Sequence, residues 1–352
     1  MIDRIEFSSF VRDRKGTFKI ATGSSDKVEN LFVKVVCGDE FGVGGGAPSR
    51  VTNETIASME AFVSKASPKL VGTDETDMLK THQRLDAVAL GNTAAKAALD
   101  IAVLDLLSKR EGKPLYEYLG GKKDRMITDM TIGIETKEVT VSKAVRYCKE
   151  GFKALKLKVG LELEDDISRV SAVRDAIGPA VELRVDANQG YTVEQAVRFA
   201  EEMDTLGVAF VEQPVKAEDL GALREVSERS HIPIMADECV CSSLEARRIA
   251  REGLADMINI KLMKCGGIQD ARQIDMFAEA AGIDTMVGCM GEMQLSIAAA
   301  LHFALSSENV RYADLDSHLC VIDDPTSGLT LEDGFLVPPG GPGIGIRTPL
   351  DA

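Results

Sequence analysis

Residues 152–160 read FKALKLKVG, with Lys156 and Lys158 separated by one leucine. The short apolar run favours a buried strand, and side chains two residues apart in a strand point to the same face. Both ammonium groups are therefore expected on one face. Burial and a neighbouring cation each lower the pKa of a lysine, which suits such a residue to abstract a proton. Taken alone, the stretch would more often be an edge strand that carries two solvated lysines.

The same arrangement, a short apolar run that ends in a charged residue, recurs further along the chain. The charged residues are Asp186 in LRVDANQ, Glu212 in FVEQP, Asp237 in IMADE, Lys261 in NIKLMK, and Asp314 with Asp316 in RYADLD. Positions 158, 186, 212, 237 and 261 follow one another at intervals of 28, 26, 25 and 24 residues. Each interval fits one strand with its following helix. We therefore expect these charges around one rim of the fold.

The segments between these positions alternate between strand and helix patterns. Candidate strands are residues 127–134, 154–159, 182–186, 209–213, 234–237, 257–262, 284–287 and 310–315, and helical stretches include residues 193–205, 220–230, 243–252 and 268–281. Eight strands, most of them followed by a helix, indicate an α/β fold of the (β/α)-barrel type. A doubly wound parallel sheet is the alternative. In a barrel the carboxyl ends of the strands form the active face, so we interpret the charged rim as catalytic.

The chain before residue 125 has a different pattern. IEFSSF, FKIAT and LFVKVVC read as three strands of an antiparallel meander, with GDEFG as a turn. Helical periodicity follows at residues 53–65, 74–88 and 92–110, the last capped by Asn92 and ended by Gly112. We predict an α+β capping domain at residues 1–124, the barrel at residues 125–324, and a Pro- and Gly-rich segment at residues 325–352 that returns to the capping domain.

Composition limits the class of protein. The 352 residues carry a formal charge of −15, which argues against nucleic-acid and anionic-membrane partners because no basic surplus exists to neutralise phosphates. The seven cysteines are odd in number and irregularly spaced, so we expect a reducing cytoplasm and no disulfide framework. We also expect no signal peptide and no membrane span. The sequence is compatible with a homo-oligomer.

The carboxylates of Asp186, Glu212 and Asp237 come from three consecutive strands, without histidine or cysteine among them. A single acidic residue is usually a helix cap or a solvated loop residue, but three in register form an all-oxygen site that suits Mg²⁺. Lysines precede and follow this arc, so they are expected on opposite walls of the barrel. Such a layout suits proton abstraction next to a carboxylate, because the cations stabilise the dianionic enolate and a base waits on each face.

The motifs KxK in LKLKVG, VDANQ, EQP, ADE and NIKLMKCGG occur in this order. With them the chain resembles the enolase superfamily, in its muconate-lactonizing-enzyme subgroup, over nearly its whole length. The resemblance implies a modified (β/α)7β barrel with an N-terminal α+β capping domain that carries specificity loops. It also implies roles for six residues: Asp186, Glu212 and Asp237 as Mg²⁺ ligands, Lys158 and Lys261 as the two acid/base catalysts, and Lys156 as a group that stabilises the enolate and contacts substrate.

Within the subgroup, the DLD of Asp314 and Asp316 resembles the dipeptide epimerases, in which this motif at the eighth strand holds the α-ammonium group of the substrate. Other positions that line the substrate in relatives are matched by Thr131, Cys289, Met290 and Gly291. The resemblance thus implies a Mg²⁺-dependent isomerase that inverts the α-carbon of the C-terminal residue of an L,L-dipeptide. The inversion would be a two-base 1,1-proton transfer through a metal-stabilised enolate.

Two departures from the family pattern bear on the substrate. Relatives that act on Ala-Glu commonly hold an arginine where this chain has Gly23, so we do not expect Ala-Glu as the substrate. Gly291 stands where a larger apolar residue is usual, which would change the size of the pocket.

Other functions stay open at this point. Within the subgroup they are an N-acyl amino acid racemase and a cycloisomerase or β-elimination lyase that acts on a carboxylate substrate. A Schiff-base aldolase could use a barrel lysine, although it has no need of three carboxylates. A non-catalytic metal- or peptide-binding relative would have no use for bases on both faces.

Overall fold

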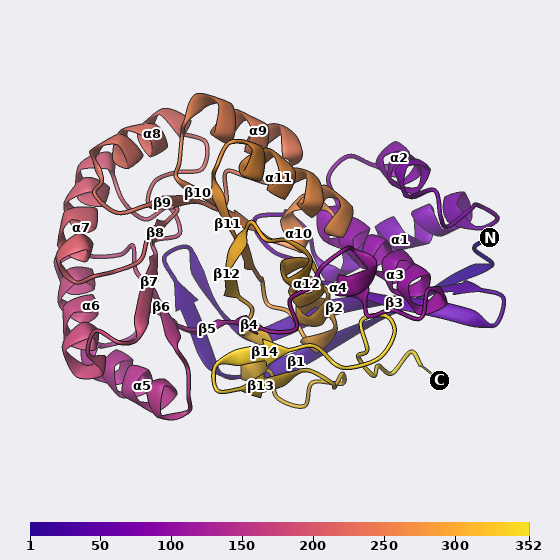
Figure 1. Cartoon of the computed structure of the whole chain (residues 1–352), viewed down its shortest axis with the longest axis horizontal. Helices are drawn as coiled ribbons and strands as arrows, with labels where there is room; N and C mark the ends of the chain where they lie inside the picture. Colours follow the sequence, from indigo (N-terminus) through magenta and orange to yellow (C-terminus); the bar gives the residue numbers. More distant parts are fainter. Residues whose placement is uncertain (352) are drawn as a thin grey trace.

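The computed structural model describes residues 1–351. An antiparallel sheet with helices on one side forms the N-terminal part, and a curved parallel sheet ringed by helices forms the rest (Figure 1). The (β/α)7β barrel with an N-terminal α+β cap is thus confirmed. None of the helices in the described part has the length and apolar character that crossing a bilayer requires.

The N-terminal sheet has the order β1-β2-β3, formed by β1 (Arg4–Ile20), β2 (Gly23–Cys37) and β3 (Glu40–Gly46). The predicted meander is correct in number, but two of its assignments are wrong. FKIAT is the end of β1 and not a strand of its own, because β1 continues past an irregularity between Asp13 and Phe18 and keeps pairing with β2. The predicted turn GDEFG contains the start of β3, which pairs with β2 from Glu40 to Gly46.

Four helices follow, α1 (Ile56–Leu70), α2 (Met78–Val88), α3 (Thr93–Arg110) and α4 (Leu115–Tyr118). The long helix α3 is buried along almost its whole length between the cap sheet and the barrel, so it is not an amphipathic surface helix. Asn92 is at the N-cap position, as expected, but its side chain makes no cap hydrogen bond. The free N–H groups of Ala94 and Ala95 donate instead to the buried carboxylate of Glu54, at 2.8 and 3.1 Å.

Helix α3 packs on β3 at backbone distance, because β3 presents glycine at alternate positions. A Cβ on Gly44 would lie 2.1 Å from the carbonyl oxygen of Ala98. Gly42 and Gly46 make equally close approaches to α3 on either side of this point. Only glycine permits this separation of strand and helix.

The barrel sheet has the strand order β5 to β12, and every neighbouring pair is parallel. Its strands are β5 (Asp129–Ile132), β6 (Ala154–Lys158), β7 (Glu182–Asp186), β8 (Val211–Glu212), β9 (Ile234–Ala236), β10 (Met257–Ile260), β11 (Asp284–Gly288) and β12 (Val310–Asp314). The helices between them are α5 (Lys137–Lys149), α6 (Leu163–Ile177), α7 (Val193–Thr205), α8 (Leu220–Arg229), α9 (Ser243–Glu252), α10 (Leu262–Cys265), α11 (Ile268–Ala280) and α12 (Gln294–Ser306). All eight expected strands are present, most of them one to three residues shorter than expected.

Side chains join the two ends of this sheet. The backbone N–H of Thr131 on β5 donates to Asp316 just after β12, at 2.6 Å, and the N–H of Leu315 donates to the hydroxyl of Thr128, at 2.9 Å. Inside the barrel, below the charged rim, Phe210, Met235, Met257 and Met286 form a buried apolar cluster. The barrel is therefore closed at its base, and polar groups inside it can be reached only from the rim.

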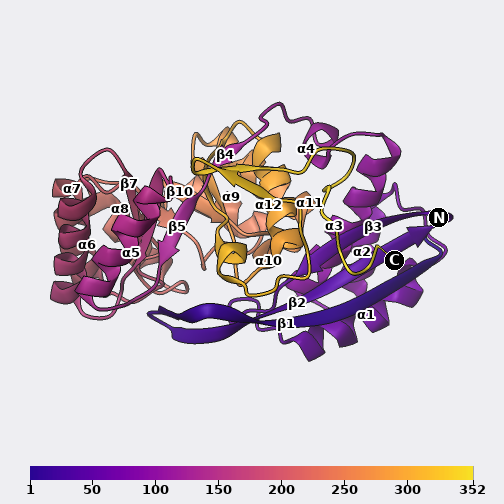
Figure 2. The same cartoon turned by 90° about the horizontal axis from the view of Figure 1, so that it is seen from below.

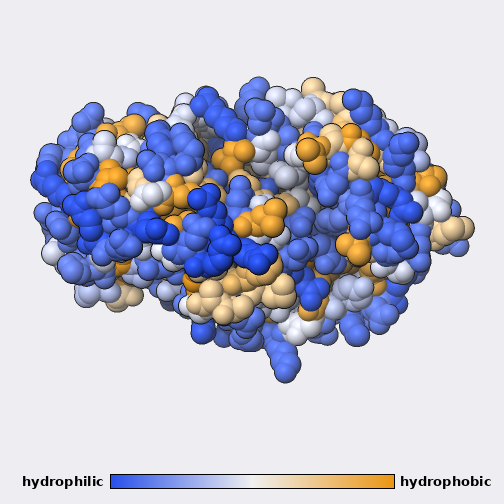
Figure 3. Space-filling view, turned by 90° about the horizontal axis from the view of Figure 1, so that it is seen from above, coloured by the Kyte–Doolittle hydropathy of each residue, from blue (hydrophilic) through white to orange (hydrophobic). Residues whose placement is uncertain are grey.

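After β12 the chain forms a short 3₁₀ helix (Ser317–Cys320) and the hairpin β13 (Thr330–Glu332) and β14 (Phe335–Val337), which pairs with β4 (Met126–Ile127). The remaining tail runs along the N-terminal part, where the N–H of Ile344 donates to Asp105 on α3 at 2.7 Å. The face of the molecule in Figure 3 is mainly hydrophilic, with hydrophobic residues in small groups.

The hairpin formed by β1 and β2 leaves the N-terminal sheet and extends along the barrel (Figure 2). Two backbone hydrogen bonds hold it there. The N–H of Ile134, after β5, donates to the carbonyl of Lys19 at 2.8 Å, and the N–H of Ile322, after β12, donates to Asp13 at 2.9 Å. The hairpin thus bridges loops that follow the first and the last barrel strands.

Candidate active site

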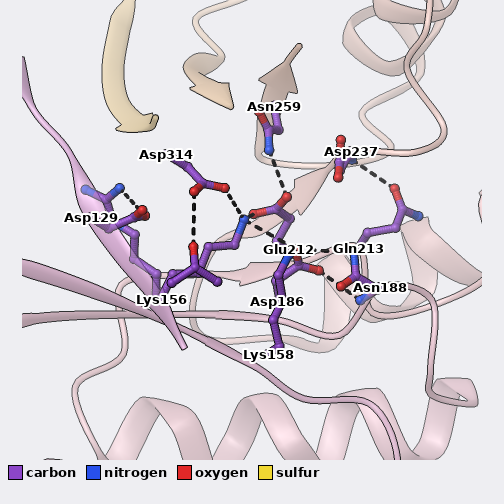
Figure 4. Close-up of polar contacts among 12 residues, drawn as sticks. Asp129, Lys156, Lys158, Asp186, Asn188, Glu212, Gln213, Asp237, Asn259 and Asp314 are labelled. Carbon is purple, nitrogen blue, oxygen red and sulfur yellow. Dashed lines mark hydrogen bonds and ion pairs between the residues drawn. The ribbon is translucent and has the colours of Figure 1, made fainter. Parts of the chain in front are cut away.

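Strand register brings the charged residues of the rim together. Lys158 lies opposite Asp186 across β6 and β7, and Asp186 lies opposite Glu212 across β7 and β8. Asp237 directly follows β9, and Lys261 directly follows β10. The expected order around the rim is therefore the order that the structure has, and Figure 4 shows Lys156, Asp186 and Glu212 close to one another.

Asp186, Glu212 and Asp237 form a buried cluster in which one carboxylate oxygen of each lies within 4.8 Å of the others. Neighbouring donors fix two of them. The side-chain amide of Asn259 donates to Glu212 at 2.8 Å, and the backbone N–H of Asn188 donates to Asp186 at 2.8 Å. Three converging, buried carboxylates without nitrogen or sulfur ligands fit a hard divalent cation such as Mg²⁺.

The pKa values of this cluster reflect crowded negative charge. Burial and the nearby carboxylates of Asp186 and Asp237 raise the pKa of Glu212 to about 8, despite its ion pair with Lys156. The pKa values of Asp186 and Asp237 are lowered, because nearby lysines outweigh the effect of burial. Like charges that share a buried site disfavour ionisation of one member, and a cation bound among them removes that cost.

The two lysines proposed as bases lie at opposite ends of this carboxylate arc. The ammonium group of Lys158 is 2.5 Å from Asp186, and that of Lys261 is 2.7 Å from Asp237. Both lysines line the same cavity. A carbon atom held between them would have an acid/base group on each face.

Lys156 contradicts the expectation of a lowered lysine pKa on this face. It is fully buried, with its ammonium group 2.7 Å from both Asp314 and Glu212 and 3.3 Å from Asp186 (Figure 4). Burial disfavours its charge, but these carboxylates outweigh burial and raise the pKa of Lys156 well above its ordinary value. Lys156 is therefore held as a cation between these carboxylates.

Asp314 and Asp316 lie together beside β5. The Thr131 hydroxyl donates to Asp314 at 3.2 Å, and the Thr131 N–H donates to Asp316 at 2.6 Å. Burial and Asp314 raise the pKa of Asp316 to about 6, while Lys156 overcomes burial and lowers the pKa of Asp314. The Cys289 sulfur and one oxygen of each carboxylate are within 4.8 Å of one another. A pair of carboxylates with such unequal pKa values suits a cationic group of a ligand.

A cavity of about 700 Å³ lies between the barrel rim and the β1–β2 hairpin. Of the twelve residues expected to form the site, nine line this cavity: Thr131, Lys158, Asp237, Lys261, Cys289, Met290, Gly291, Asp314 and Asp316. The other three, Lys156, Asp186 and Glu212, are completely buried beneath it. The residues expected from the sequence are therefore brought together in one place.

Sequence reasoning missed the residues that position these groups. Lys264 is buried and its ammonium group is 2.6 Å from Asp237, which shares its two oxygens between Lys264 and Lys261. Gln213 has a positive φ of 34° and accepts a hydrogen bond from the N–H of Asp237 at 2.9 Å. Lys264 stands in the motif NIKLMK and Gln213 in the motif EQP. The sequence analysis used both motifs but gave neither residue a role.

Two arginines of the cap that line the cavity were also missed. Arg50 lies against Gly23, where a Cβ would be 3.2 Å from its guanidinium, and donates to the Thr22 carbonyl at 2.6 Å. At Gly23, where the arginine of relatives is absent, the cation is therefore supplied by Arg50 from a different segment. Arg14 lies against Gly291, where a Cβ would be 3.0 Å from its guanidinium. Neither contact has a signal in the sequence, because the partners are far apart along the chain.

Comparisons with known proteins agree with this architecture. Residues 5–120 match the family model of the mandelate racemase / muconate lactonizing enzyme N-terminal domain, and residues 139–352 match that of the enolase C-terminal domain-like family. Together the two matches cover most of the chain.

The chain is also similar to characterised dipeptide epimerases. It is 40% identical to an L-Ala-D/L-Glu epimerase of Clostridium acetobutylicum, over 95% of each chain, and 39% identical to a hydrophobic dipeptide epimerase of Enterococcus faecalis, over 90% of this chain and 91% of the relative. A solved structure of dipeptide epimerase from Enterococcus faecalis, complexed with Mg and L-Leu-L-Tyr, superposes with a TM-score of 0.96 at 37% identity and covers 98% of this chain and 99% of that one. Relatives of nearly equal similarity differ in substrate, so overall similarity does not select one.

Proposed function

The chain belongs to the mandelate racemase / muconate lactonizing enzyme family of the enolase superfamily, and from this premise we propose that it is a Mg²⁺-dependent dipeptide epimerase. The enzyme is an isomerase acting on amino acid derivatives, and its cofactor is Mg²⁺. The reaction we propose is inversion of the α-carbon of the C-terminal residue of an L,L-dipeptide.

One observation supports this proposal over the other functions considered. The ammonium groups of Lys158 and Lys261 contact opposite ends of a buried three-carboxylate cluster, and a second carboxylate pair, Asp314 and Asp316, lines the same cavity. Two bases on two faces suit removal of a proton from one side of a carbon and its return to the other. A pair of carboxylates suits an ammonium group on the same substrate.

In this mechanism Asp186, Glu212 and Asp237 would hold Mg²⁺, which would supply positive charge next to the substrate carboxylate. Lys158 and Lys261 act on opposite faces of the α-carbon, one as base and the other as acid. Lys156 supports the developing negative charge with a fixed cation that cannot lose its proton at neutral pH. The closed base of the barrel and the hairpin above the rim limit access of water to the reacting carbon.

The net charge of the ion-paired groups in the site is compatible with the proposed reaction. Four carboxylates, Asp186, Glu212, Asp237 and Asp314, are in ion pairs with the ammonium groups of Lys156, Lys158, Lys261 and Lys264. With Glu212 ionised, which a bound cation would favour, these eight groups sum to zero net charge. A divalent cation would then add two positive charges for a dianionic enolate.

The second candidate, an N-acyl amino acid racemase, shares every residue of the proposed mechanism except Asp314 and Asp316. An N-acyl substrate has no ammonium group, so burial of two carboxylates beside the cavity would serve no purpose in substrate binding. This carboxylate pair favours the dipeptide.

The test is incubation of the Mg²⁺-loaded enzyme with pools of L,L-dipeptides in D₂O, followed by mass spectrometry. We expect a gain of one mass unit at the α-carbon of the C-terminal residue. Asp314→Asn should raise KM and lower kcat/KM for free dipeptides. If N-acetylated dipeptides turn over as well as free ones, the assignment of Asp314 is wrong, and if no dipeptide gains deuterium, the proposed function is wrong.

A further inference from the structure

Arg14 is a cation in the wall of the substrate cavity that the proposed mechanism does not use. It stands on β1 and lines the cavity, with its guanidinium over the ring of Phe18 at 5.2 Å. Its Nε atom is buried and has no hydrogen-bond partner among residues 1–351. A guanidinium that is held in place by stacking and keeps unused donors is ready to bind an anion.

The guanidinium of Arg14 lies in the space that a side chain at position 291 would need. A Cβ at position 291 would lie 3.0 Å from Nη2 of Arg14, closer than ordinary van der Waals contact. The backbone of Gly291 does not have the positive φ that would otherwise call for glycine. The glycine therefore leaves space for the side chain of Arg14. The guanidinium occupies this space, so the glycine adds a positive charge to the wall of the cavity.

The guanidinium lies on the side of the cavity that holds Asp314 and Asp316. Gly291 follows Cys289 by two residues, and the Cys289 sulfur lies within 4.8 Å of one oxygen of each carboxylate of the pair. Cys320, which also lines the cavity, is within electrostatic reach of both charges: burial and Asp316 raise the pKa of its thiol, and Arg14 opposes them. A negative pair and a positive group are thus neighbours in one wall.

The N-terminal residue of a dipeptide carries its ammonium group and its side chain on the same carbon. If Asp314 and Asp316 hold the ammonium group, the side chain of the N-terminal residue starts at the same wall of the cavity as Arg14. We propose that this enzyme selects dipeptides whose N-terminal residue has a side-chain carboxylate, and that the guanidinium of Arg14 binds this carboxylate. This inference rests on the proposed function and names the substrate class within it.

The other arginine of the cavity is at a different place. Arg50 lies beside Gly23 and Thr22 at the turn of the β1–β2 hairpin, and it already donates to a backbone carbonyl. Of the two arginines, Arg14 is therefore the one beside Gly291 and Cys320, on the side of the carboxylate pair. A carboxylate accepts two N–H groups of a guanidinium side by side, whereas the amide of Asn or Gln turns one donor toward it. The expected preference for Asp over Asn is roughly tenfold or more.

The test compares kcat/KM for L-Asp-L-Ala and L-Glu-L-Ala with that for L-Asn-L-Ala and L-Gln-L-Ala, using deuterium uptake at the C-terminal α-carbon. L-Ala-L-Asp shows whether the preference belongs to the N-terminal residue. The variants are Arg14→Gln, which removes the charge, and Gly291→Ala, which displaces the guanidinium. The matched control is Arg12→Gln, because Arg12 stands on the same strand and is half-buried like Arg14, but it bonds to the Asp323 carbonyl and does not line the cavity.

We expect the wild-type enzyme and Arg12→Gln to prefer L-Asp-L-Ala over L-Asn-L-Ala by about tenfold or more, and both cavity variants to bring this ratio close to one. Equal rates with Asp and Asn in the wild-type enzyme would overturn the inference and leave the proposed function standing. A preference that survives Arg14→Gln, or that follows the acid to L-Ala-L-Asp, would also overturn it. If no dipeptide takes up deuterium, the proposed function fails and this inference with it.

Discussion

Lys156 contacts carboxylates from three different strands, and this makes it the residue that links the two halves of the site. One of its partners, Asp314, belongs to the pair proposed for the ammonium group, and the other two, Glu212 and Asp186, belong to the proposed metal cluster. Removing its charge would leave buried carboxylates in both halves without a counter-ion. In the proposed complex, the closeness of one lysine to both groups would set the distance between the ammonium group of the dipeptide and its reacting carboxylate.

The two proposed bases can be separated by stereochemistry. Replacing Lys158 or Lys261 with alanine should lower epimerisation by roughly 10²–10⁴-fold, because each variant lacks the acid or base on one face. Each variant should still exchange the α-proton of one diastereomer with D₂O, and the two variants should act on opposite diastereomers. The measurement is deuterium uptake into L,L- and L,D-dipeptides by mass spectrometry.

A Mg²⁺-dependent rise in thermal stability in both variants would show that they are folded and bind metal. Full epimerase activity in either variant, or exchange of the same diastereomer by both, would contradict the two-base mechanism.

At the scale of elements, the contact between β3 and α3 depends on glycine. Gly44→Ala would drive a Cβ to 2.1 Å from the Ala98 carbonyl, a group that cannot move without displacing the buried helix. We expect a loss of stability of about 1–3 kcal/mol or more, the usual cost of overpacking. The measurement is urea-induced unfolding. Gly340→Ala is the control, since a Cβ there meets nothing within 4 Å, and an equal effect of the two substitutions would contradict this account.

A second link between elements joins the cap to the barrel through His82 on α2. Its Nε2 is 2.8 Å from Asp100 on α3, its Nδ1 is 3.6 Å from Asp270 on α11, and Asp100 also accepts the N–H of Ile268 at 2.6 Å. Burial lowers the pKa of His82, but the two carboxylates outweigh burial and raise it to about 10. The histidine is therefore charged in the folded protein at neutral pH.

This shift gives stability a defined pH dependence. A raised pKa means that the folded state binds the proton more tightly, so the contribution of His82 is complete below its unfolded pKa of about 6.5 and is lost as pH rises toward 10. We expect the wild-type protein to exceed His82→Gln by roughly 1.5–3 kcal/mol at pH 6 and by almost nothing above pH 10. Unfolding by urea at pH 6, 8 and 9.5 measures the difference, and a difference that is constant or grows with pH would contradict it.

At the scale of the whole molecule, the barrel, its rim and the presence of an α+β cap could be predicted from the sequence, but the contacts between the cap and the barrel could not. Strand–helix units have a narrow range of lengths, so charges at intervals of 24–28 residues fall on one rim whatever the details of packing. The contacts of Arg14 with Gly291 and of Arg50 with Gly23 depend on how the cap lies on the barrel. No local pattern encodes that arrangement. Strand β3 was not predicted, because its glycines are required by the close packing of α3, which is distant in the sequence.

The proposed metal ligands come from three strands that meet only in the folded barrel, so metal binding should stabilise the whole molecule. At a Mg²⁺ concentration of one hundred times Kd the gain is about 2.7 kcal/mol, which for a chain of this size corresponds to a rise in Tm of roughly 3–4 °C. Removal of Mg²⁺ with a chelator should reverse it, as measured by differential scanning calorimetry. Asp237→Asn removes one ligand and should abolish the Mg²⁺-dependent shift, whereas Asp316→Asn, outside the cluster, should retain it. A wild-type protein without the shift, or a shift that persists in Asp237→Asn, would show that the metal binds elsewhere. Since this measurement needs no substrate, it tests the metal site separately from the choice of dipeptide.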